Sequence, residues 1–329
     1  MKEQILKLLK ESGNIFLSGQ KISEVLGVSR AAIWKHIKTI KDDGYEIEAI
    51  SRKGYRIVSS PDILTFEEIK NFLDTEYIGK NIIYYDSIGS TNSKAKELAE
   101  SGQEHGTVII SEEQTTGRGR LGRNFISPKY KGIWMSIILR PNIITENIAQ
   151  VTLIGAAAVQ KAIMKMGIET KIKWPNDIVL NSKKICGILT EMSGEINHIN
   201  YLVMGIGINV NLDVEDIPLD LKDRATSIKL ESGRFIERKI LLANVLNIFE
   251  KLYTDFVQND NIKETIEICR KNSILIGKEI QLINRGKVTT SIAIDISDNG
   301  ELVIENNQGI VEHIASGEVS IRGIYGYSK

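Results

Sequence analysis

The sequence is poor in the residues that cross-link a chain or anchor it in a membrane. Its 329 residues include two cysteines and five prolines. Two cysteines cannot build the disulfide framework of a small secreted domain. No uncharged apolar run approaches the roughly 20 residues that a membrane helix needs, and the charged first segment lacks the apolar core of a signal peptide. We therefore expect a soluble, cytoplasmic protein.

Net charge is also absent, since 42 Lys and Arg residues balance 42 Asp and Glu residues. The two signs are unevenly distributed. Residues 1–60 contain eleven basic and seven acidic residues, a net charge of +4, so the rest of the chain carries −4. A basic segment on an acidic body suggests a nucleic-acid partner for that segment. At roughly 100–200 residues per domain, the length predicts two or three domains.

The basic segment begins with the pattern of three short helices. Ser18 and Ser29 are predicted to cap the second and third helices, and Gly27 to end the second. Isoleucines at helical spacing give the third helix one buried face. Its other face has no acidic residue from Arg30 to Lys41. This pattern predicts a helix-turn-helix, whose second helix enters the major groove of DNA.

Two alternating runs, residues 45–50 and 54–58, follow the third helix and predict a wing with a basic tip. One basic helix face is usually only a solvated surface. Here the helix spacing, the glycine turn and the basic hairpin occur together, which favours DNA binding. An exposed Trp34 fits contact with a thymine methyl group, with the wing or with another subunit. The predicted DNA-binding residues are Ser29, Arg30, Trp34, Lys35, Lys38, Arg52 and Lys53.

The remaining sequence divides into two parts. Residues 63–270 mix strand-like and helix-like runs and predict a mixed α/β domain. Their first part, residues 63–82, is a connector predicted to contain one amphipathic helix near residues 66–72. Residues 271–329 contain four alternating runs, at 279–283, 289–296, 301–304 and 318–321, with turn signals such as residues 298–300 between them, and predict a small all-β domain. With the winged helix-turn-helix at 1–62, the predicted fold class is a multidomain α+β protein.

An arginine and glycine loop at residues 112–123 is the most unusual segment. Its glycines allow close backbone approach to a ligand, and Arg118, Arg120 and Arg123 supply donors suited to phosphate or carboxylate. The loop lacks the Walker and dinucleotide patterns. A flexible RNA-binding tract is the alternative. Its single occurrence between two strands favours an ordered anion-binding loop.

Four further segments have both a structural and a functional interpretation. Pro175, Asn176 and Asp177 predict a tight turn between strands, which Asp177 could simply close. The nearby Lys184 lies where a strand becomes apolar, so its ammonium group points either inward or to solvent. The glycines of residues 205–209 either pack tightly or leave room for a flat ligand. The run at residues 86–92 is at least a helix cap.

Together these segments resemble the motifs of biotin protein ligases, in the same order. With the helix-turn-helix, the whole chain is similar to the family of bifunctional biotin ligases and biotin-operon repressors. One departure is Cys186, where the family commonly has alanine; both are small, so we expect no loss of function. The motifs are Ser90-Thr91-Asn92, Gln114 with Gly117–Arg123, Lys173–Asp177, Lys184–Leu189 and Gly205–Asn209.

The resemblance implies a two-step reaction. Biotin and MgATP give biotinyl-5'-AMP and pyrophosphate, and a lysine of a biotin carrier domain, as in acetyl-CoA carboxylase, then attacks the adenylate. It implies catalytic roles for Lys184, Asp177 and Arg118, with Asp177 either a base or an orienting group. The biotin-binding residues would be Ser90, Thr91, Asn92, Gln114, Arg118, Gly119, Arg120 and Lys184. The ATP-binding or adenylate-binding residues would be Arg120, Arg123, Asn176, Lys184 and Asn209.

The resemblance also implies partners and a regulatory role. The adenylate would act as corepressor and favour a homodimer on the operator DNA of biotin genes, with the strand at 133–139 as the dimer edge. The C-terminal domain would be SH3-like. Magnesium would be held mainly by the phosphates of ATP, and the histidines show no ligand spacing for zinc. A non-catalytic biotin-sensing repressor and a lipoate-type ligase remain as alternatives.

Overall fold

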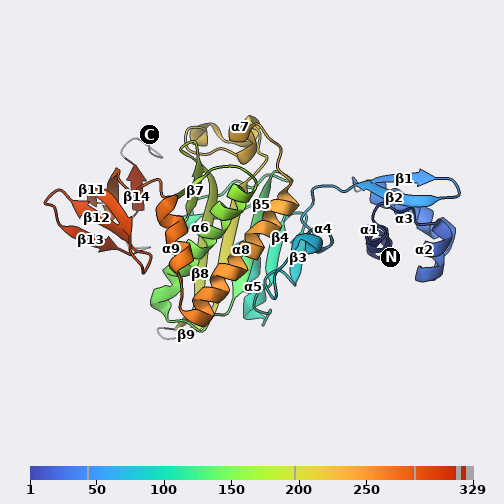
Figure 1. Cartoon of the computed structure of the whole chain (residues 1–329), viewed down its shortest axis with the longest axis horizontal. Coiled ribbons are helices and arrows are strands. Elements are labelled where there is room, and N and C mark those ends of the chain that lie inside the picture. Colours follow the sequence, from blue (N-terminus) through green and yellow to red (C-terminus); the bar gives the residue numbers. More distant parts are fainter. Residues whose placement is uncertain (43, 196–197, 285–286, 316–319, 324–329) are drawn as a thin grey trace. The chain divides into compact units, whose positions relative to one another are not determined.

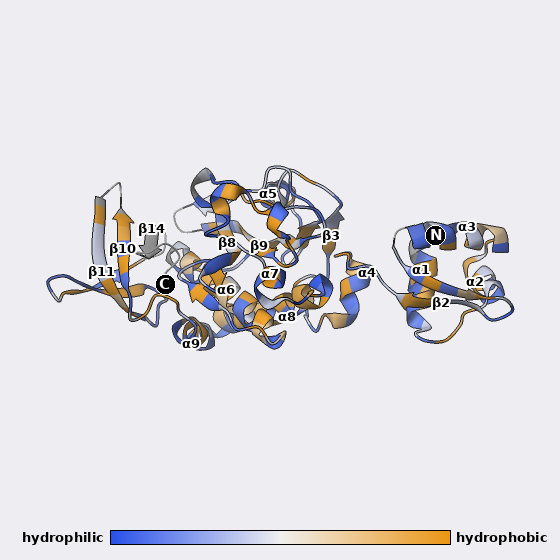
Figure 2. Cartoon of the chain, turned by 90° about the horizontal axis from the view of Figure 1, so that it is seen from above, coloured by the Kyte–Doolittle hydropathy of each residue, from blue (hydrophilic) through white to orange (hydrophobic). Residues whose placement is uncertain are grey.

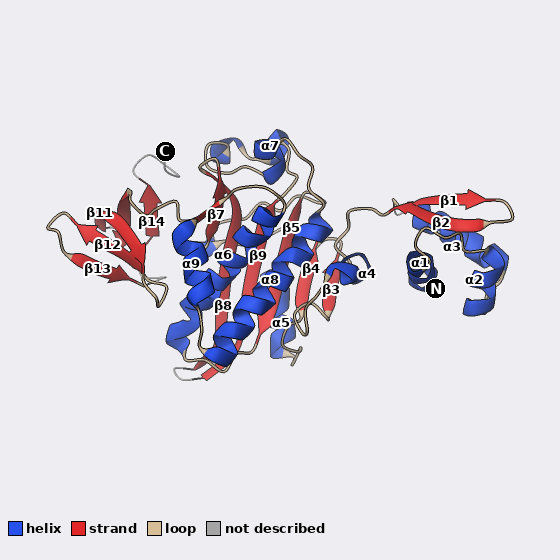
Figure 3. Cartoon of the chain, in the orientation of Figure 1, coloured by secondary structure: helices blue, strands red, loops and turns tan. Residues whose placement is uncertain are grey.

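Residues 1–63 and 64–329 form separate units in the computed structural model (Figure 1). The structure describes residues 1–42, 44–195, 198–284, 287–315 and 320–323. The first unit consists of three helices and a hairpin, and the second of a mixed sheet with helices and a smaller antiparallel sheet (Figure 3). The predicted α+β fold class is confirmed. No described helix is long and apolar enough to cross a membrane.

The first unit has a hydrophobic core of its own, built from the isoleucine face of its third helix together with apolar residues of the other helices and the hairpin. The Ser18 hydroxyl accepts the Lys21 amide at 3.1 Å and so caps the second helix. Gly27 ends that helix with a left-handed φ of 66°, a conformation that glycine adopts without a steric penalty. The elements are α1 (Lys2–Glu11), α2 (Gly19–Leu26), α3 (Arg30–Asp42), β1 (Glu46–Ile50) and β2 (Gly54–Ser59).

A seven-stranded mixed sheet organises the second unit, in the order β3-β4-β5-β9-β8-β7-β6. The β3–β4 pair is parallel, and the other neighbouring pairs are antiparallel. The strands are β3 (Ile82–Tyr85), β4 (Val108–Ser111), β5 (Gly132–Leu139), β6 (Lys171–Lys173), β7 (Asp177–Leu180), β8 (Lys183–Glu195) and β9 (His198–Asn209).

Helices cover both faces of this sheet (Figure 2). Alternate residues of the central strands belong to different core clusters. Ile109, Ile138 and Val203 pack with Ala95 of one helix, whereas the residues between them pack with the longer helices. One face therefore carries α5 (Thr91–Glu100), and the other carries α6 (Ile148–Lys165) and α8 (Arg238–Asn259). The same unit also contains α7 (Ile228–Ser232) and α9 (Lys263–Lys271).

The expected dimer edge at residues 133–139 is wrong. These residues belong to β5, which pairs with β4 on one side and β9 on the other. All eight residues of β5 are buried. Its backbone groups are thus already used within the sheet, and it has no edge to offer. Residues 189–195 of β8, in contrast, pair with β9 alone among the described strands.

The connector joins the second unit through a buried ion pair. It contains α4 (Phe66–Ile69) and a 3-10 turn at Lys70–Phe72, close to the helix expected there. The Leu64 amide donates to Glu112 Oε1 at 3.0 Å, and Arg238 Nη1 donates to Glu112 Oε2 at 2.6 Å. The Arg238 and Glu112 side chains are 1% and 0% exposed. Because a charge that loses a buried partner is costly, this pair ties the connector to the end of β4.

A five-stranded antiparallel sheet ends the chain, in the order β13-β12-β11-β10-β14. The indole of Trp174 donates to the Gly300 carbonyl at 2.9 Å and so joins this sheet to the larger one. The pattern analysis missed one strand, β13, and the expected strand residues 318 and 319 lie outside the described residues. The strands are β10 (Glu279–Asn284), β11 (Lys287–Ile296), β12 (Leu302–Asn306), β13 (Val311–Ile314) and β14 (Ser320–Gly323).

Candidate active site

A polar pocket lies at the beginning of α5, where the arginine loop meets the glycine-bearing strands β8 and β9. Five of the predicted ligand-binding residues line it, although they are separated by up to 28 positions in the sequence, because the loop pairs back beside the start of α5. The lining residues are Ser90, Thr91, Asn92, Gln114, Arg118, Phe125, Met135, Gly187, Leu189, Gly205, Ile206 and Gly207.

The side chain of Gln114 is fixed on both sides. Its Oε1 accepts the Thr91 amide at 2.9 Å and the Thr91 hydroxyl at 3.1 Å. Its Nε2 donates to the Ser127 hydroxyl at 2.9 Å. Ser90 caps α5, accepting the Ser93 amide at 3.5 Å. The predicted helix cap and the predicted ligand site are therefore the same segment.

Asn92 lies against a glycine of β9. Its Oδ1 accepts a hydrogen bond from the Ser136 hydroxyl at 2.6 Å. A Cβ atom placed on Gly205 would stand 2.1 Å from Asn92 Oδ1, so only glycine leaves room for this amide. Gly205 therefore leaves the space that the Asn92 amide occupies in the wall of the pocket.

We expect Gly205→Ala to raise the KM for the pocket's ligand by about 10- to 100-fold, the cost of overpacking a well-packed site. The added methyl group would displace the Asn92 amide, and Asn92 belongs to the polar pocket wall. Steady-state kinetics with varied ligand measures this effect. Ile208→Val, a buried change on the same strand at a position that does not line the pocket, is the matched control and should leave KM unchanged. An unchanged KM in Gly205→Ala would contradict this assignment.

The ring of Phe125 covers the next glycines. A Cβ atom on Gly207 would meet its ring at 2.5 Å, and one on Gly187 would meet it at 3.3 Å. Phe125 also makes an edge contact with the buried ring of Trp134 at 5.8 Å between centroids. Gly207, one of the glycines expected either to pack tightly or to leave room for a flat ligand, therefore packs against the ring of Phe125.

Lys184 and Asp177 form an ion pair across the β7–β8 hairpin. Lys184 Nζ donates to Asp177 Oδ1 at 2.5 Å, and the side chains are 24% and 14% exposed. The ammonium group also lies 6.0 Å from the centroid of the Phe125 ring. Lys184 is thus turned towards the site and not to bulk solvent. Asp177 is bonded to this cation, whereas Trp174 of the same motif is buried in the core.

The arginine loop folds into an ordered turn. The Gly119 amide donates to the Arg123 carbonyl at 2.7 Å around a 3-10 turn at Arg120–Gly122. Arg120 Nη1 donates to Asn176 Oδ1 at 3.1 Å, which brings two predicted nucleotide-binding residues together. Arg118 lines the pocket, and both Arg118 and Arg123 are exposed. The loop therefore presents cations for a polyanion.

Asn209 carries an unsatisfied buried atom. Its Nδ2 donates to the Thr226 carbonyl at 2.9 Å. Its Oδ1 is buried and has no hydrogen-bond partner among the described residues. Since buried polar atoms are normally paired, this oxygen is available to a ligand donor.

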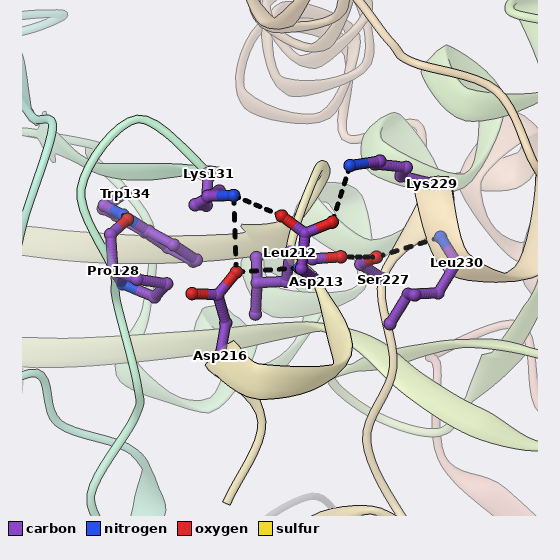
Figure 4. A network of polar contacts seen from close by, with 9 residues as sticks. All are labelled: Pro128, Lys131, Trp134, Leu212, Asp213, Asp216, Ser227, Lys229 and Leu230. Atoms are coloured by element: carbon purple, nitrogen blue, oxygen red, sulfur yellow. Dashed lines mark hydrogen bonds and ion pairs between the residues drawn. The ribbon is translucent and has the colours of Figure 1, made fainter.

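A charged network connects the segment after β9 to Lys131, which directly precedes β5, and to Lys229 of α7 (Figure 4). Lys131 and Lys229 approach Asp213 from opposite sides, with Lys229 Nζ 2.6 Å from Asp213 Oδ1. Lys131 also lies 3.6 Å from Asp216 Oδ2. Hydrogen bonds from the two lysines lower the pKa of Asp213 to about 2, so its carboxylate is ionised at neutral pH.

This segment also contacts the hairpin that carries the ion pair. The Lys184 amide donates to the Arg224 carbonyl at 2.8 Å, and the Thr226 amide donates to the Lys184 carbonyl at 2.9 Å. Leu212 and Ile217 of the same segment pack on Trp134. Two groups of the site, the Lys184 backbone and the Asn209 amide, are therefore held by residues 224–226.

The predicted DNA-binding residues share one property, since all of them are exposed. The side chain of Trp34 is 62% exposed. The third helix buries Ile33, Ile37 and Ile40 on its opposite side. The exposed residues are Ser29, Arg30, Trp34, Lys35, Lys38, Arg52 and Lys53.

Two residues of the site were missed by the pattern analysis. Ser136 is buried between the Thr91 hydroxyl and the Asn92 amide. It is the one hydroxyl in the apolar run of β5, which was a usable signal. Phe125 gave no such signal, because a single aromatic residue after the arginine loop has no periodic context.

Three family models match the chain. The Biotin/lipoate A/B protein ligase family matches residues 84–209, an HTH domain matches residues 2–56, and the Biotin protein ligase C terminal domain matches residues 275–322. These ranges correspond, in the same order, to the mixed sheet, the first unit with its three helices and hairpin, and the small antiparallel sheet.

Whole-chain relatives match as well. The bifunctional ligase/repressor BirA of Bacillus subtilis is 41% identical over 94% of this chain and 95% of its own length. That of Escherichia coli is 28% identical over 93% of each chain. A structure of the biotin protein ligase from Aquifex aeolicus in complex with biotin and ATP is 32% identical, with a TM-score of 0.66, and covers 74% of this chain and 99% of that chain.

Proposed function

This chain belongs to the family of bifunctional biotin protein ligases and repressors, and from that premise we propose how its residues carry out each activity. The second unit forms biotinyl-5'-AMP from biotin and ATP and transfers biotin to a lysine of a carrier domain of the acetyl-CoA carboxylase type. The first unit binds the operator DNA of biotin genes. The observation that carries the ligase activity is the Lys184–Asp177 ion pair beside the polar pocket.

The polar pocket takes the ureido head of biotin. A ureido group offers two N–H donors and one carbonyl acceptor, and the pocket contains hydroxyl groups of Ser90 and Thr91 and the amide of Asn92. Gln114 acts by holding Thr91 in place. Small polar groups fixed in this manner orient a ligand.

In the first step the biotin carboxylate attacks the α-phosphorus of ATP, and pyrophosphate leaves. Two anions must approach each other, so cations are needed to offset their repulsion. Lys184 contacts the activated carboxyl group, and Arg118 and Arg120 close over biotin and the phosphates. Arg123, Asn176 and Asn209 complete the nucleotide site, with the unpaired oxygen of Asn209 accepting a donor from the nucleotide.

In the second step the amine of the carrier lysine attacks the mixed anhydride, and AMP leaves. An amine with an ordinary pKa of about 10.4 must lose a proton before or during attack. Asp177 orients Lys184 through their 2.5 Å contact, and this is the role that the contact supports. A second role, as acceptor of the amine proton, requires Asp177 to leave that ion pair.

Magnesium enters with the nucleotide. Mg²⁺ keeps several water ligands and commonly binds through substrate phosphates. Asp177, the carboxylate beside Lys184, is already paired with that lysine, and residues 117–123 of the arginine loop contain three arginines and no acidic residue. The site therefore fits a metal held by phosphates and not by protein carboxylates.

The adenylate also acts as corepressor. When the adenylate is bound, the arginine loop closes and two chains associate. The first units of the two chains then bind the two half-sites of the operator. Residues 189–195 of β8, which pair with β9 alone among the described strands, are the strand edge that supports such a dimer. Both cysteines are free and buried, which fits the reducing cytoplasm.

Incubation of the protein with biotin, MgATP and a biotin carrier domain tests the ligase. We expect one biotin on the acceptor lysine, detected by mass spectrometry, and none when ATP is omitted. Lipoate in place of biotin should give no product, which separates this activity from that of a lipoate-type ligase. Folded protein that leaves the carrier unmodified would instead indicate a biotin-sensing repressor.

A further inference from the structure

The amide of Asn92 lies between groups of opposite hydrogen-bonding character. On one side its Oδ1 accepts from the Ser136 hydroxyl at 2.6 Å. On the other side its Nδ2 donates to Glu191 Oε2 at 2.8 Å and to the Leu189 carbonyl at 3.3 Å. The second carboxylate oxygen, Glu191 Oε1, accepts from Lys96 Nζ at 2.8 Å. Asn92 and Lys96 lie on α5 and Glu191 on β8, so this contact joins a helix to the sheet.

An ionised carboxylate can only accept hydrogen bonds, whereas an asparagine amide can both donate and accept. Burial alone would raise the pKa of Glu191, but hydrogen bonds from Lys96 and Asn92 lower it below its ordinary value. The carboxylate is therefore ionised at neutral pH. It requires the NH₂ group of Asn92 to face it, so the carbonyl oxygen must face Ser136.

We propose that Glu191, held by Lys96, is a positioning residue that fixes the orientation of the Asn92 amide and thereby sets the preference for a ligand head with N–H donors. The inference rests on the proposed function and deepens it. Both N–H groups of Asn92 are used by Glu191 and Leu189, so the oxygen, which has a second lone pair beside its bond from Ser136, is the atom that accepts a ureido N–H group. With the amide reversed, its own N–H groups would face those of the ligand. The dithiolane head of lipoate has no N–H donor and gains nothing from this oxygen.

The substitution Glu191→Gln is expected to reverse the amide. The ammonium group of Lys96 attracts the oxygen of the new Gln side chain, so the Gln NH₂ group turns towards Asn92. Two NH₂ groups then face each other, and Asn92 rotates to accept. We expect the KM for biotin to rise about tenfold, the size of one hydrogen bond between ligand and protein, with kcat and the KM for ATP unchanged.

Removal of the ammonium group should rescue this variant. In Lys96→Met/Glu191→Gln nothing fixes the Gln side chain, so its oxygen can return to Asn92. The KM for biotin should fall to within about threefold of the wild-type value, because a neutral hydrogen bond replaces the charge-assisted one. Lys96→Met alone leaves the carboxylate in place and should change KM by less than about threefold. A purely structural role would make the double variant worse and not better.

Two further variants separate orientation from packing. Glu191→Ala removes the acceptor without creating a donor, and the Leu189 carbonyl still favours the original amide orientation, so its KM should rise less than that of Glu191→Gln. Met192→Ala changes the exposed neighbour on β8 and should not alter KM. Thermal unfolding of each full-length variant shows that it folds.

Biotin-dependent ATP–pyrophosphate exchange with varied biotin is the measurement. A wild-type KM in Glu191→Gln, or a double variant no better than Glu191→Gln, would overturn the proposal. So would an equal loss in Glu191→Ala and Glu191→Gln. Wild-type protein without any biotin-dependent exchange would instead overturn the ligase function itself, and the two failures are therefore distinguishable.

Discussion

Replacement of Lys184 by Met is expected to lower the rate of adenylate formation by about 10²- to 10³-fold, the size of losing one preorganised charge at a reacting centre. The ammonium group is bonded to Asp177 and lies beside Phe125, at the edge of the pocket. Methionine keeps most of the side-chain volume and removes the charge. Biotin-dependent ATP–pyrophosphate exchange measures the effect on the first step without a carrier protein.

The adjacent Lys183→Met is the matched control, because it removes the same charge from the neighbouring position of β8. Successive residues of a strand point to opposite faces, so this change should leave exchange nearly intact. Asp177→Asn should slow both half-reactions if Asp177 only orients Lys184, and mainly transfer if it is the base. If Lys184→Met unfolds at a much lower temperature, the ion pair is structural and the catalytic assignment is wrong.

Deletion of residues 1–60 is expected to weaken operator binding by at least about 10³-fold, because most of the phosphate contacts are lost. Adenylate formation should largely survive. The deleted segment has its own core, and the connector is held by the contact of Leu64 with Glu112 in the remaining unit. Mobility-shift titrations with and without biotin and MgATP measure the DNA affinity, and ATP–pyrophosphate exchange measures the ligase.

Charge substitutions in the full-length chain refine this test. Lys35→Gln with Lys38→Gln should lower the slope of log affinity against log salt by about one per lost phosphate contact. Lys7→Gln, on an exposed face of α1, is the control, because it changes the charge of the first unit outside the third helix. Unchanged operator binding by the truncated protein would remove the repressor assignment and leave the ligase assignment standing.

The local features of the fold followed from the sequence. The caps at Ser18 and Ser29, the stop at Gly27 and the turn at residues 298–300 depend on groups within a few positions of each other. The strand at residues 311–314 was missed, since it has exposed residues on both faces and no clean alternation. Buried β5 was recognised as a strand, but its sheet neighbours were not, and it was therefore mistaken for an edge.

The sequence by itself determined the order of the domains and the family, and it predicted the residues that bind biotin, ATP and DNA. The tertiary structure alone decided how those residues are oriented. Asn92 meets Glu191, 99 positions away, only because α5 packs on β5 and β9 and β8 is the next strand of the sheet. Sequence periodicity reports which face of an element is buried, whereas a hydrogen bond between distant residues depends on strand order and register. The sequence gives the type of each residue in the site, whereas the direction of its hydrogen bonds follows only from the tertiary structure.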